Sequence, residues 1–200
     1  MAMQFSVLVR NGRANAIETV IGATAILRLR TGAPPATCAT ADSGTALATM
    51  NLPVDYFTAA SAGSMPKLGT WQDAAADAAG TAAHFRLYDS GGTVCGLQGT
   101  CGQSVILATS ALTAANGNVL TFTATTGVIV GLNVSGVGVP ADATVVAVSA
   151  TTVTLSHTST AGVASAASIT FAYDLPIDNA VIALNQLVTV NTFTINEANA

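Results

Sequence analysis

The first periodic pattern of apolar residues lies near the start of the chain. Ala14, Ile17 and Ile21 recur at spacings of three and four residues, so they would share one face of a helix. Asn11 is suited to accept from the free N–H groups of the first turn, and Gly22 is suited to end the last turn. The pattern therefore predicts one short N-terminal helix between Asn11 and Gly22.

After this helix the apolar residues alternate with polar ones, which is typical of strands that bury one face. Between residues 25 and 30, Leu27 and Leu29 alternate with Arg28 and Arg30. Further strands are predicted at 45–52, at 84–88, at 93–98 and at 186–196, where the alternation changes phase near Asn191 and indicates a bulge.

Two of these strands are predicted to form a β-hairpin. Residues 84–88 and 93–98 flank the turn sequence Asp89-Ser-Gly-Gly92, which is rich in residues that favour tight turns. The preceding stretch, 61–82, is rich in Ala, Gly and Asp and is predicted to be a loop anchored by Trp71.

The next segment has a different composition, with almost no charged residues. Between 108 and 173 the only charged residue is Asp142, and short runs of alternating apolar residues predict several strands. We interpret 108–176 as a small β-module inserted into a core domain formed by 1–107 and 177–200, since exposed loops tolerate such insertions.

These patterns together predict an all-β protein. We expect a β-sandwich or jelly-roll-like core with one short N-terminal helix and a small inserted β-domain.

Composition narrows the classes of function. Of the 200 residues only 8% are charged, and the net charge is −4, so the chain lacks the basic clusters that bind nucleic acid. An apolar fraction of 50% argues against disorder, and no uninterrupted apolar run is long enough to span a membrane. The first ten residues do not have the pattern of a signal peptide, so we expect folding in a cytoplasm.

The chain has three cysteines, which allow three interpretations. Cys95 and Cys101 lie close in sequence and could pair, although a reducing cytoplasm disfavours disulfides. Cys38, Cys95, Cys101 and His84 are suitable zinc ligands, but their spacing matches no familiar zinc motif. We favour buried free thiols and expect no metal or other cofactor.

The search for catalytic residues finds no constellation. His84 alternates with residues of a predicted outer strand face, and His157 is expected to be partly buried at a strand end, each without a catalytic partner in the pattern. Asp73 and Asp77 lie four residues apart, which only weakly resembles a calcium loop. We therefore expect no catalytic residues and no enzymatic activity.

The arginines are the best candidates for binding a partner. Arg28 and Arg30 share one strand face, and Arg86 is expected on a similar outward face of another strand. Three exposed guanidinium groups could form ion pairs with a carboxylate-bearing protein, or they could only keep the sheet soluble.

Several stretches carry a family resemblance. The four stretches outside the insertion are Phe5-Ser-Val-Leu-Val-Arg-Asn11, Ile26-Leu-Arg-Leu-Arg-Thr-Gly-Ala-Pro-Pro-Ala36, Leu47-Ala-Thr-Met-Asn-Leu-Pro53 and Gly80-Thr-Ala-Ala-His-Phe-Arg-Leu-Tyr-Asp-Ser-Gly-Gly92. They resemble a group of small structural proteins of tailed bacteriophages and prophages. The resemblance implies a place in the virion and no active site.

The insertion carries a second resemblance. Val128-Ile-Val-Gly-Leu-Asn-Val-Ser-Gly-Val-Gly-Val-Pro140 and Val153-Thr-Leu-Ser156 are similar to a β-module that recurs in phage virion proteins and bacterial surface proteins. Members usually have a glycine near Asp142 or Ala143, which this chain lacks, so its turn is expected to differ.

Three hypotheses about function follow. The first is a capsid decoration or cement protein, bound in many copies to other virion proteins and itself oligomeric, in particles assembled in the host cytoplasm. The second is a tail-associated or receptor-binding component, although Phe122, Phe171 and Tyr173 alternate like core residues and not like a glycan platform. The third, a depolymerase, would need paired carboxylates, and the insertion offers only Asp142 and Asp174.

Overall fold

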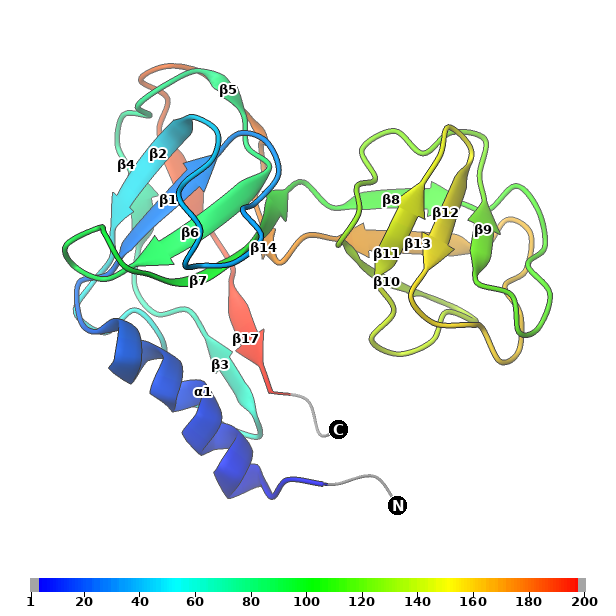
Figure 1. Ribbon diagram of the computed structural model, residues 1–200, viewed down its shortest axis with the longest axis horizontal. Coiled ribbons are helices and arrows are strands. Elements are labelled where there is room, and N and C mark those ends of the chain that lie inside the picture. Colours follow the sequence, from blue (N-terminus) through cyan, green and yellow to red (C-terminus); the bar gives the residue numbers. More distant parts are fainter. Residues whose placement is uncertain (1–3, 198–200) are drawn as a thin grey trace. The chain divides into compact units, whose positions relative to one another are not determined.

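The computed structural model describes residues 4–197, which form two compact units (Figure 1). Unit 1 comprises the chain up to Gly102 and from Leu175 onward, and unit 2 comprises Gln103–Asp174. The boundaries differ from the predicted 108 and 176 because of strand pairing: β8 (Val105–Ala108) pairs within unit 2, whereas β14 (Leu175–Pro176) pairs with a strand of unit 1.

The described residues contain seventeen strands and one α-helix, so the prediction of an all-β fold with one N-terminal helix is confirmed. The helix, α1 (Val7–Ile21), begins earlier than predicted, with Ser6 as its N-cap accepting from the N–H of Val9. Gly22 ends the helix, as predicted. Asn11 is not the cap, because its side chain accepts from the backbone of a distant segment instead.

The largest sheet of unit 1 has five strands in the order β14-β7-β6-β1-β2. The pairs are antiparallel except β14–β7. Its four longer strands are β1 (Ile26–Arg30), β2 (Ala46–Asn51), β6 (His84–Tyr88) and β7 (Cys95–Gly102). The predicted hairpin of β6 and β7 is present, with a register shift opposite Tyr88.

Three two-stranded ladders complete unit 1. They are β3 (Ser64–Pro66) with β17 (Thr194–Asn196), β4 (Trp71–Asp73) with β16 (Val188–Val190), and β5 (Gly80–Thr81) with β15 (Val181–Ile182). The predicted loop 61–82 was therefore wrong in part, because it holds three short strands. The single predicted strand 186–196 is two strands, interrupted where Phe193 enters the core.

The core of unit 1 lies between the five-stranded sheet and the ladders. Leu27, Leu29 and Phe85 of the sheet belong to the same buried cluster as Trp71 and Phe193. The Trp71 and Phe193 ring centroids are 5.8 Å apart, and those of Phe85 and Phe193 are 5.5 Å apart in an edge-to-face contact. Trp71 is thus the anchor that the sequence predicted. The short ladders that bury it were not predicted.

Unit 2 has its own core between two three-stranded sheets, in the orders β10-β13-β8 and β11-β12-β9. Its other strands are β9 (Val119–Thr121), β10 (Asn133–Gly136), β11 (Val145–Val148), β12 (Thr152–Leu155) and β13 (Ser168–Ala172). Phe122 and Phe171 contact edge to face at 5.6 Å. Asp142 adopts a left-handed conformation with φ of 56°, so an aspartate occupies a backbone position of the kind that glycine favours.

Candidate functional site

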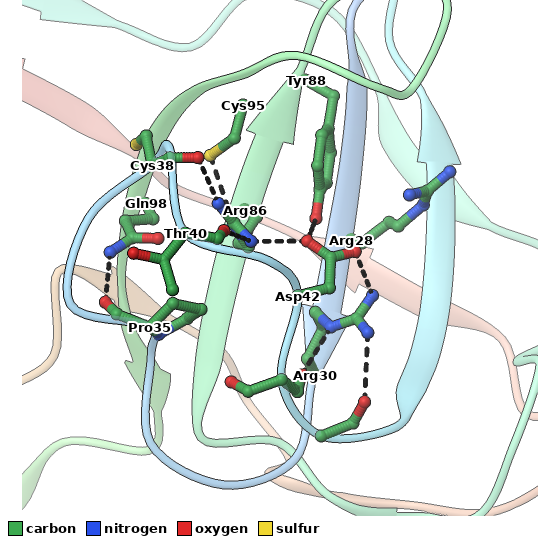
Figure 2. Close-up of polar contacts among 12 residues, drawn as sticks. Arg28, Arg30, Pro35, Cys38, Thr40, Asp42, Arg86, Tyr88, Cys95 and Gln98 are labelled. Atoms are coloured by element: carbon green, nitrogen blue, oxygen red, sulfur yellow. Dashed lines mark hydrogen bonds and ion pairs between the residues drawn. The ribbon is translucent and has the colours of Figure 1, made fainter.

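The outer face of the five-stranded sheet carries a polar cluster beneath a long loop. All five residues of β6 are buried, although their sequence alternates between apolar and polar. The loop of residues 31–45, which connects β1 to β2, supplies the cover (Figure 2). We call this arrangement the arginine latch: Arg28, Arg30, Arg86 and Tyr88 on the sheet, with Asp42 from the loop.

Arg86 is the centre of the arginine latch. Its Nη2 donates to the carbonyl of Cys38 at 2.6 Å and its Nη1 to the carbonyl of Thr40 at 3.1 Å and to Asp42 Oδ1. Its Nε donates to Sγ of Cys95 at 3.3 Å. The donors of this guanidinium, which is 1% exposed, are thus directed at protein acceptors.

Asp42 holds the loop by its charge. Oδ1 also accepts from the hydroxyl of Tyr88 at 2.6 Å, and Oδ2 pairs with Arg30 Nη1 at 3.1 Å. Burial by itself would raise the pKa of Asp42, but the Tyr88 hydrogen bond and the charges of Arg30, Arg86 and Arg28 outweigh it and lower this pKa. Burial and the bond to Asp42 raise the pKa of Tyr88 to about 12. Near neutral pH the Asp42 carboxyl is therefore ionised and the Tyr88 hydroxyl keeps its proton.

The two other arginines bind neighbouring loops. Arg30 donates from Nε to the carbonyl of Ser43 at 2.8 Å and from Nη2 to that of Gly44 at 3.0 Å. Arg28 donates to the carbonyl of Gly92 at 3.2 Å, and its guanidinium lies 4.7 Å from the Tyr88 ring centroid. Both side chains stabilise loop backbone, as Arg86 does.

The prediction of three exposed arginines was wrong for two of them. Arg86 and Arg30 are buried, and Arg28 is half-buried. The structure does bring the three together on one face, but Asp42 is the carboxylate that they meet. Sequence reasoning missed Asp42, because nothing in the local pattern of residues 31–45 shows that this loop folds back over the sheet.

His84 was expected on a surface or interface and is instead fully buried. Its Nδ1 lies 2.8 Å from the carbonyl of Gly32, which requires the proton on this nitrogen, while Nε2 is buried without a hydrogen-bond partner. Burial lowers the pKa of His84, and the charges of Arg30 and Arg86 lower it further against the opposing effects of Gly32 and Asp42. His84 is therefore a neutral side chain that anchors the start of the loop.

The cysteines are all free, and their positions exclude the pairing considered from the sequence. Cys95 and Cys101 both lie on β7, where a rise of about 3.3 Å per residue separates their Cα atoms by roughly 20 Å, far beyond disulfide reach. Cys101 belongs to the buried core, and burial raises its pKa to about 12. Cys95 belongs to the other face, because the register shift at this end of β7 changes its phase.

The four suggested zinc ligands do not converge. Cys101 lies in the core, whereas Cys38 and Cys95 lie at the arginine latch. Within residues 4–197 no group of three or more His, Cys, Asp and Glu side chains is arranged to hold a metal ion.

The other candidates from the sequence have structural environments. Asp73 accepts from the N–H groups of Thr49 and Ala75, and Asp77 accepts from the Thr49 hydroxyl at 2.7 Å. The two carboxylates therefore anchor β2 to neighbouring segments. His157 is exposed, not partly buried as expected, because β12 ends before it at Leu155.

A small hollow of about 250 Å³ opens at the arginine latch. Its lining includes Cys38, Asp42, Arg86, Tyr88 and Cys95. Asp42 and Arg86 form an ion pair there. The residues that line the hollow therefore include no carboxylate or histidine that is free to act as a general base. Its two thiols are the reactive groups that remain.

Helix α1 forms a second distinctive surface, because polar side chains dock it together with the buried Ala14 and Ile21. Asn11 accepts from Gly63 N at 2.7 Å, Asn15 from Ala60 N at 2.8 Å, and Glu18 from Tyr56 N at 2.8 Å and Phe57 N at 3.2 Å. The three acceptors stand at i, i+4 and i+7 and so share one helix face.

Four apolar side chains of α1 are open to solvent. Leu8 and Val20 are 81% and 83% exposed, and Val7 and Val9 are about half exposed. The apolar stripe predicted from the sequence is buried as in an ordinary surface helix, since Ala14 and Ile21 belong to the core of unit 1 and Ile17 packs against it, so the four exposed residues are apolar surface in addition to that stripe. Sequence periodicity found Ala14, Ile17 and Ile21 but did not show that Leu8 and Val20 would remain uncovered.

No helix within residues 4–197 is both long and apolar enough to cross a membrane. The chain matches no protein-family model, and comparisons with curated proteins and with solved structures likewise find no match. The resemblance to structural proteins of tailed bacteriophages therefore stays a prediction that rests on the residues themselves.

Proposed function

We propose that this chain is a non-enzymatic structural subunit of a bacteriophage virion, bound in many copies to the capsid surface as a decoration or cement protein. The observation that carries this proposal is the apolar surface of α1, which leaves Leu8 and Val20 in solvent although Ala14 and Ile21 of the same helix are buried in the core. The resemblance of the flanking stretches to phage structural proteins supports the same conclusion.

The exposed apolar side chains of α1 are suited to contact with neighbouring subunits. Leu8 and Val20 each expose more than four-fifths of their surface, and burying such side chains contributes about 25 cal/mol per Å². Isolated exposed apolar residues are ordinary, but several on one helix of a protein with only 8% charged residues favour a surface that neighbours cover.

The internal pairing of the arginines changes the expected chemistry of that contact. Arg30 and Arg86 neutralise Asp42, so they are not available to a carboxylate-bearing partner in this conformation. Binding to the capsid protein would depend on apolar burial and backbone contacts, and would be only weakly sensitive to salt.

A tail-associated or receptor-binding component is the second candidate. It is favoured by the organisation of Gln103–Asp174, which has a core of its own and contributes no residue to the core of unit 1. Such a module can vary without disturbing the domain that carries it.

Immunogold electron microscopy of purified particles, with antibody against this chain, distinguishes the two candidates. Label distributed over the heads is the expected result, whereas label confined to the tail would favour the second candidate. Absence of label from intact particles, with the protein abundant in infected cells and its epitopes accessible, would overturn the virion proposal.

Substitutions on α1 test the proposed contact. The double variant Leu8→Ser/Val20→Ser should fold normally and occupy particles at a level reduced at least tenfold. The matched control is Val94→Ser, which changes a side chain that is 64% exposed elsewhere on unit 1. Equal occupancy for the two variants would show that α1 is not part of the contact surface. An apparent molecular mass of the isolated protein that rises with its concentration would identify self-association.

A further inference from the structure

Two of the three thiols meet at the arginine latch. Cys38 belongs to the loop of residues 31–45, and Cys95 is the first residue of β7. Arg86 binds both residues, the carbonyl of Cys38 at 2.6 Å and the sulfur of Cys95 at 3.3 Å, and both line the same hollow (Figure 2). Residues far apart in the sequence are thus held together by one guanidinium.

The two thiol side chains also interact directly. Burial raises the pKa of Cys38 to about 11, and a hydrogen bond with the Cys95 side chain adds to this effect. Both residues are partly exposed, so a small oxidant can reach them from the hollow. Cys101, in contrast, is buried in the core of unit 1 and takes no part in this contact.

We propose that Cys38 and Cys95 are a redox-active pair that forms a disulfide between the 31–45 loop and β7 when the protein meets an oxidant. This modification site does not depend on the proposed function, since it follows from the position of the two thiols alone.

The expected oxidant is a small-molecule disulfide. The Cys95 sulfur, as its thiolate, attacks one sulfur of the oxidant, whose S–S bond breaks and releases one thiolate, leaving a mixed disulfide on Cys95. The Cys38 sulfur then attacks the Cys95 sulfur, loses its proton to solvent and displaces the second thiol. In total the two cysteines lose two electrons and two protons, and the oxidant is reduced to two thiols.

Arg86 favours the first of these steps. Its Nε–H already donates to the Cys95 sulfur, so a negative charge on this sulfur lies beside a cation. Burial raises the pKa of Cys38 to about 11, which disfavours its thiolate, so Cys38 is the thiol that resolves the mixed disulfide. The order of attack is therefore Cys95 first and Cys38 second.

The disulfide would fasten the loop to the sheet. It would close a loop of roughly 60 residues, which restricts the unfolded chain and raises Tm by on the order of 5–10 °C. In a reducing cytoplasm both thiols stay free, so the cross-link is expected only after exposure to an oxidising medium.

The test is oxidation of the full chain by oxidised glutathione, followed by thiol counting and peptide mapping under non-reducing conditions. Chymotrypsin can cut after Leu97, which separates Cys95 from Cys101. The variants Cys38→Ser and Cys95→Ser each remove one partner, and Cys101→Ala is the matched control that leaves the pair intact. Tm is measured for each protein before and after oxidation.

The expected result is a peptide that joins Cys38 to Cys95 in the wild type and in Cys101→Ala, with a rise in Tm. Cys38→Ser and Cys95→Ser should give no internal cross-link and at most one glutathione adduct. Three free thiols in the oxidised wild type, a stable adduct on Cys95 without a link to Cys38, or a cross-link that needs Cys101 would each overturn the proposal. The wild-type peptide map decides the question even if a serine variant fails to fold.

Discussion

Arg86 and Asp42 lie 44 positions apart in the chain, and their side chains form an ion pair in which the guanidinium is 1% exposed and the carboxylate 33% exposed. Asp42 is the only acidic residue that this arginine contacts among the ion pairs of residues 4–197. Removing the carboxylate therefore leaves a buried cation bonded only to neutral acceptors, and this defines the first prediction.

Asp42→Ala should lower the free energy of unfolding by about 2–3 kcal/mol, less than the loss of a fully buried pair because water reaches part of Asp42. Urea unfolding at pH 7 measures this change. Asp42→Asn keeps an acceptor for Tyr88 and should cost less than alanine. Asp55→Ala, at an exposed position, is the control, and an equal loss for Asp42→Ala and Asp55→Ala would contradict the role of the arginine latch.

The buried His84 predicts a dependence of stability on pH. Its pKa in the folded protein lies below the ordinary value of 6.5, because burial and the nearby Arg30 and Arg86 disfavour its charged form despite Asp42. The unfolded chain thus binds the proton first as pH falls. The contribution of neutral His84 to the free energy of unfolding is therefore complete above pH 6.5 and is lost as the pH falls below it. The free energy of unfolding should fall by at most about 1.4 kcal/mol per pH unit in this range.

Urea unfolding between pH 8 and pH 5 measures this slope. In His84→Asn the amide can still donate to the Gly32 carbonyl but does not titrate, so the slope around pH 6 should disappear. His157→Asn is the matched control, because His157 is exposed and should leave the slope unchanged. A wild-type slope retained in His84→Asn would assign the pH dependence to other groups.

Local patterns predicted the longer strands well and the short ones poorly. Leu27 and Leu29 alternate with arginines over a full strand, so β1 could be identified without tertiary information. A strand such as β4 has three residues, too few to show a period, and exists because it pairs with β16 more than one hundred residues later. The fold class could therefore be predicted, while the ladders could not.

The sequence predicted the candidate site only in part, because its contacts also join segments far apart in the chain. Polar residues that alternate along a strand normally face solvent, and this rule placed His84 and Arg86 on the surface. The loop of residues 31–45 covers them, and only long-range contacts such as Arg86 with Cys38 and Thr40 show it. The residues themselves were identified correctly, but their partners and burial depend on that loop.

The loop of residues 31–45 should be sensitive to substitution at Gly44. This glycine has φ of 65°, and a Cβ atom there would lie 1.9 Å from the carbonyl oxygen of Thr31. Gly32 has a similar φ of 76° but open space around it, so Gly32→Ala measures the conformational strain alone, about 1 kcal/mol. Gly44→Ala should cost clearly more, about 3 kcal/mol. Equal urea midpoints for the two variants would show that Thr31 moves aside without cost.

The last prediction concerns how α1 is held. Glu18 Oε1 accepts from the N–H groups of both Tyr56 and Phe57, which belong to the aromatic part of the core. Glu18→Ala leaves two largely buried N–H groups without this acceptor and should lower the free energy of unfolding by about 2–3 kcal/mol. Glu18→Gln retains an oxygen at the same place and should lose less than half of that.

Hydrogen exchange at the amides of Tyr56 and Phe57 gives a local readout of this contact. Both amides should exchange at least tenfold faster in Glu18→Ala than in the wild type, because the helix no longer covers them with an acceptor. Val20→Ala is the control on the exposed side of α1 and should leave both rates unchanged. If Glu18→Ala lowered stability without changing these two rates, the loss would come from the helix itself, and the contact of Glu18 with the amides of Tyr56 and Phe57 would not be what holds α1 in place.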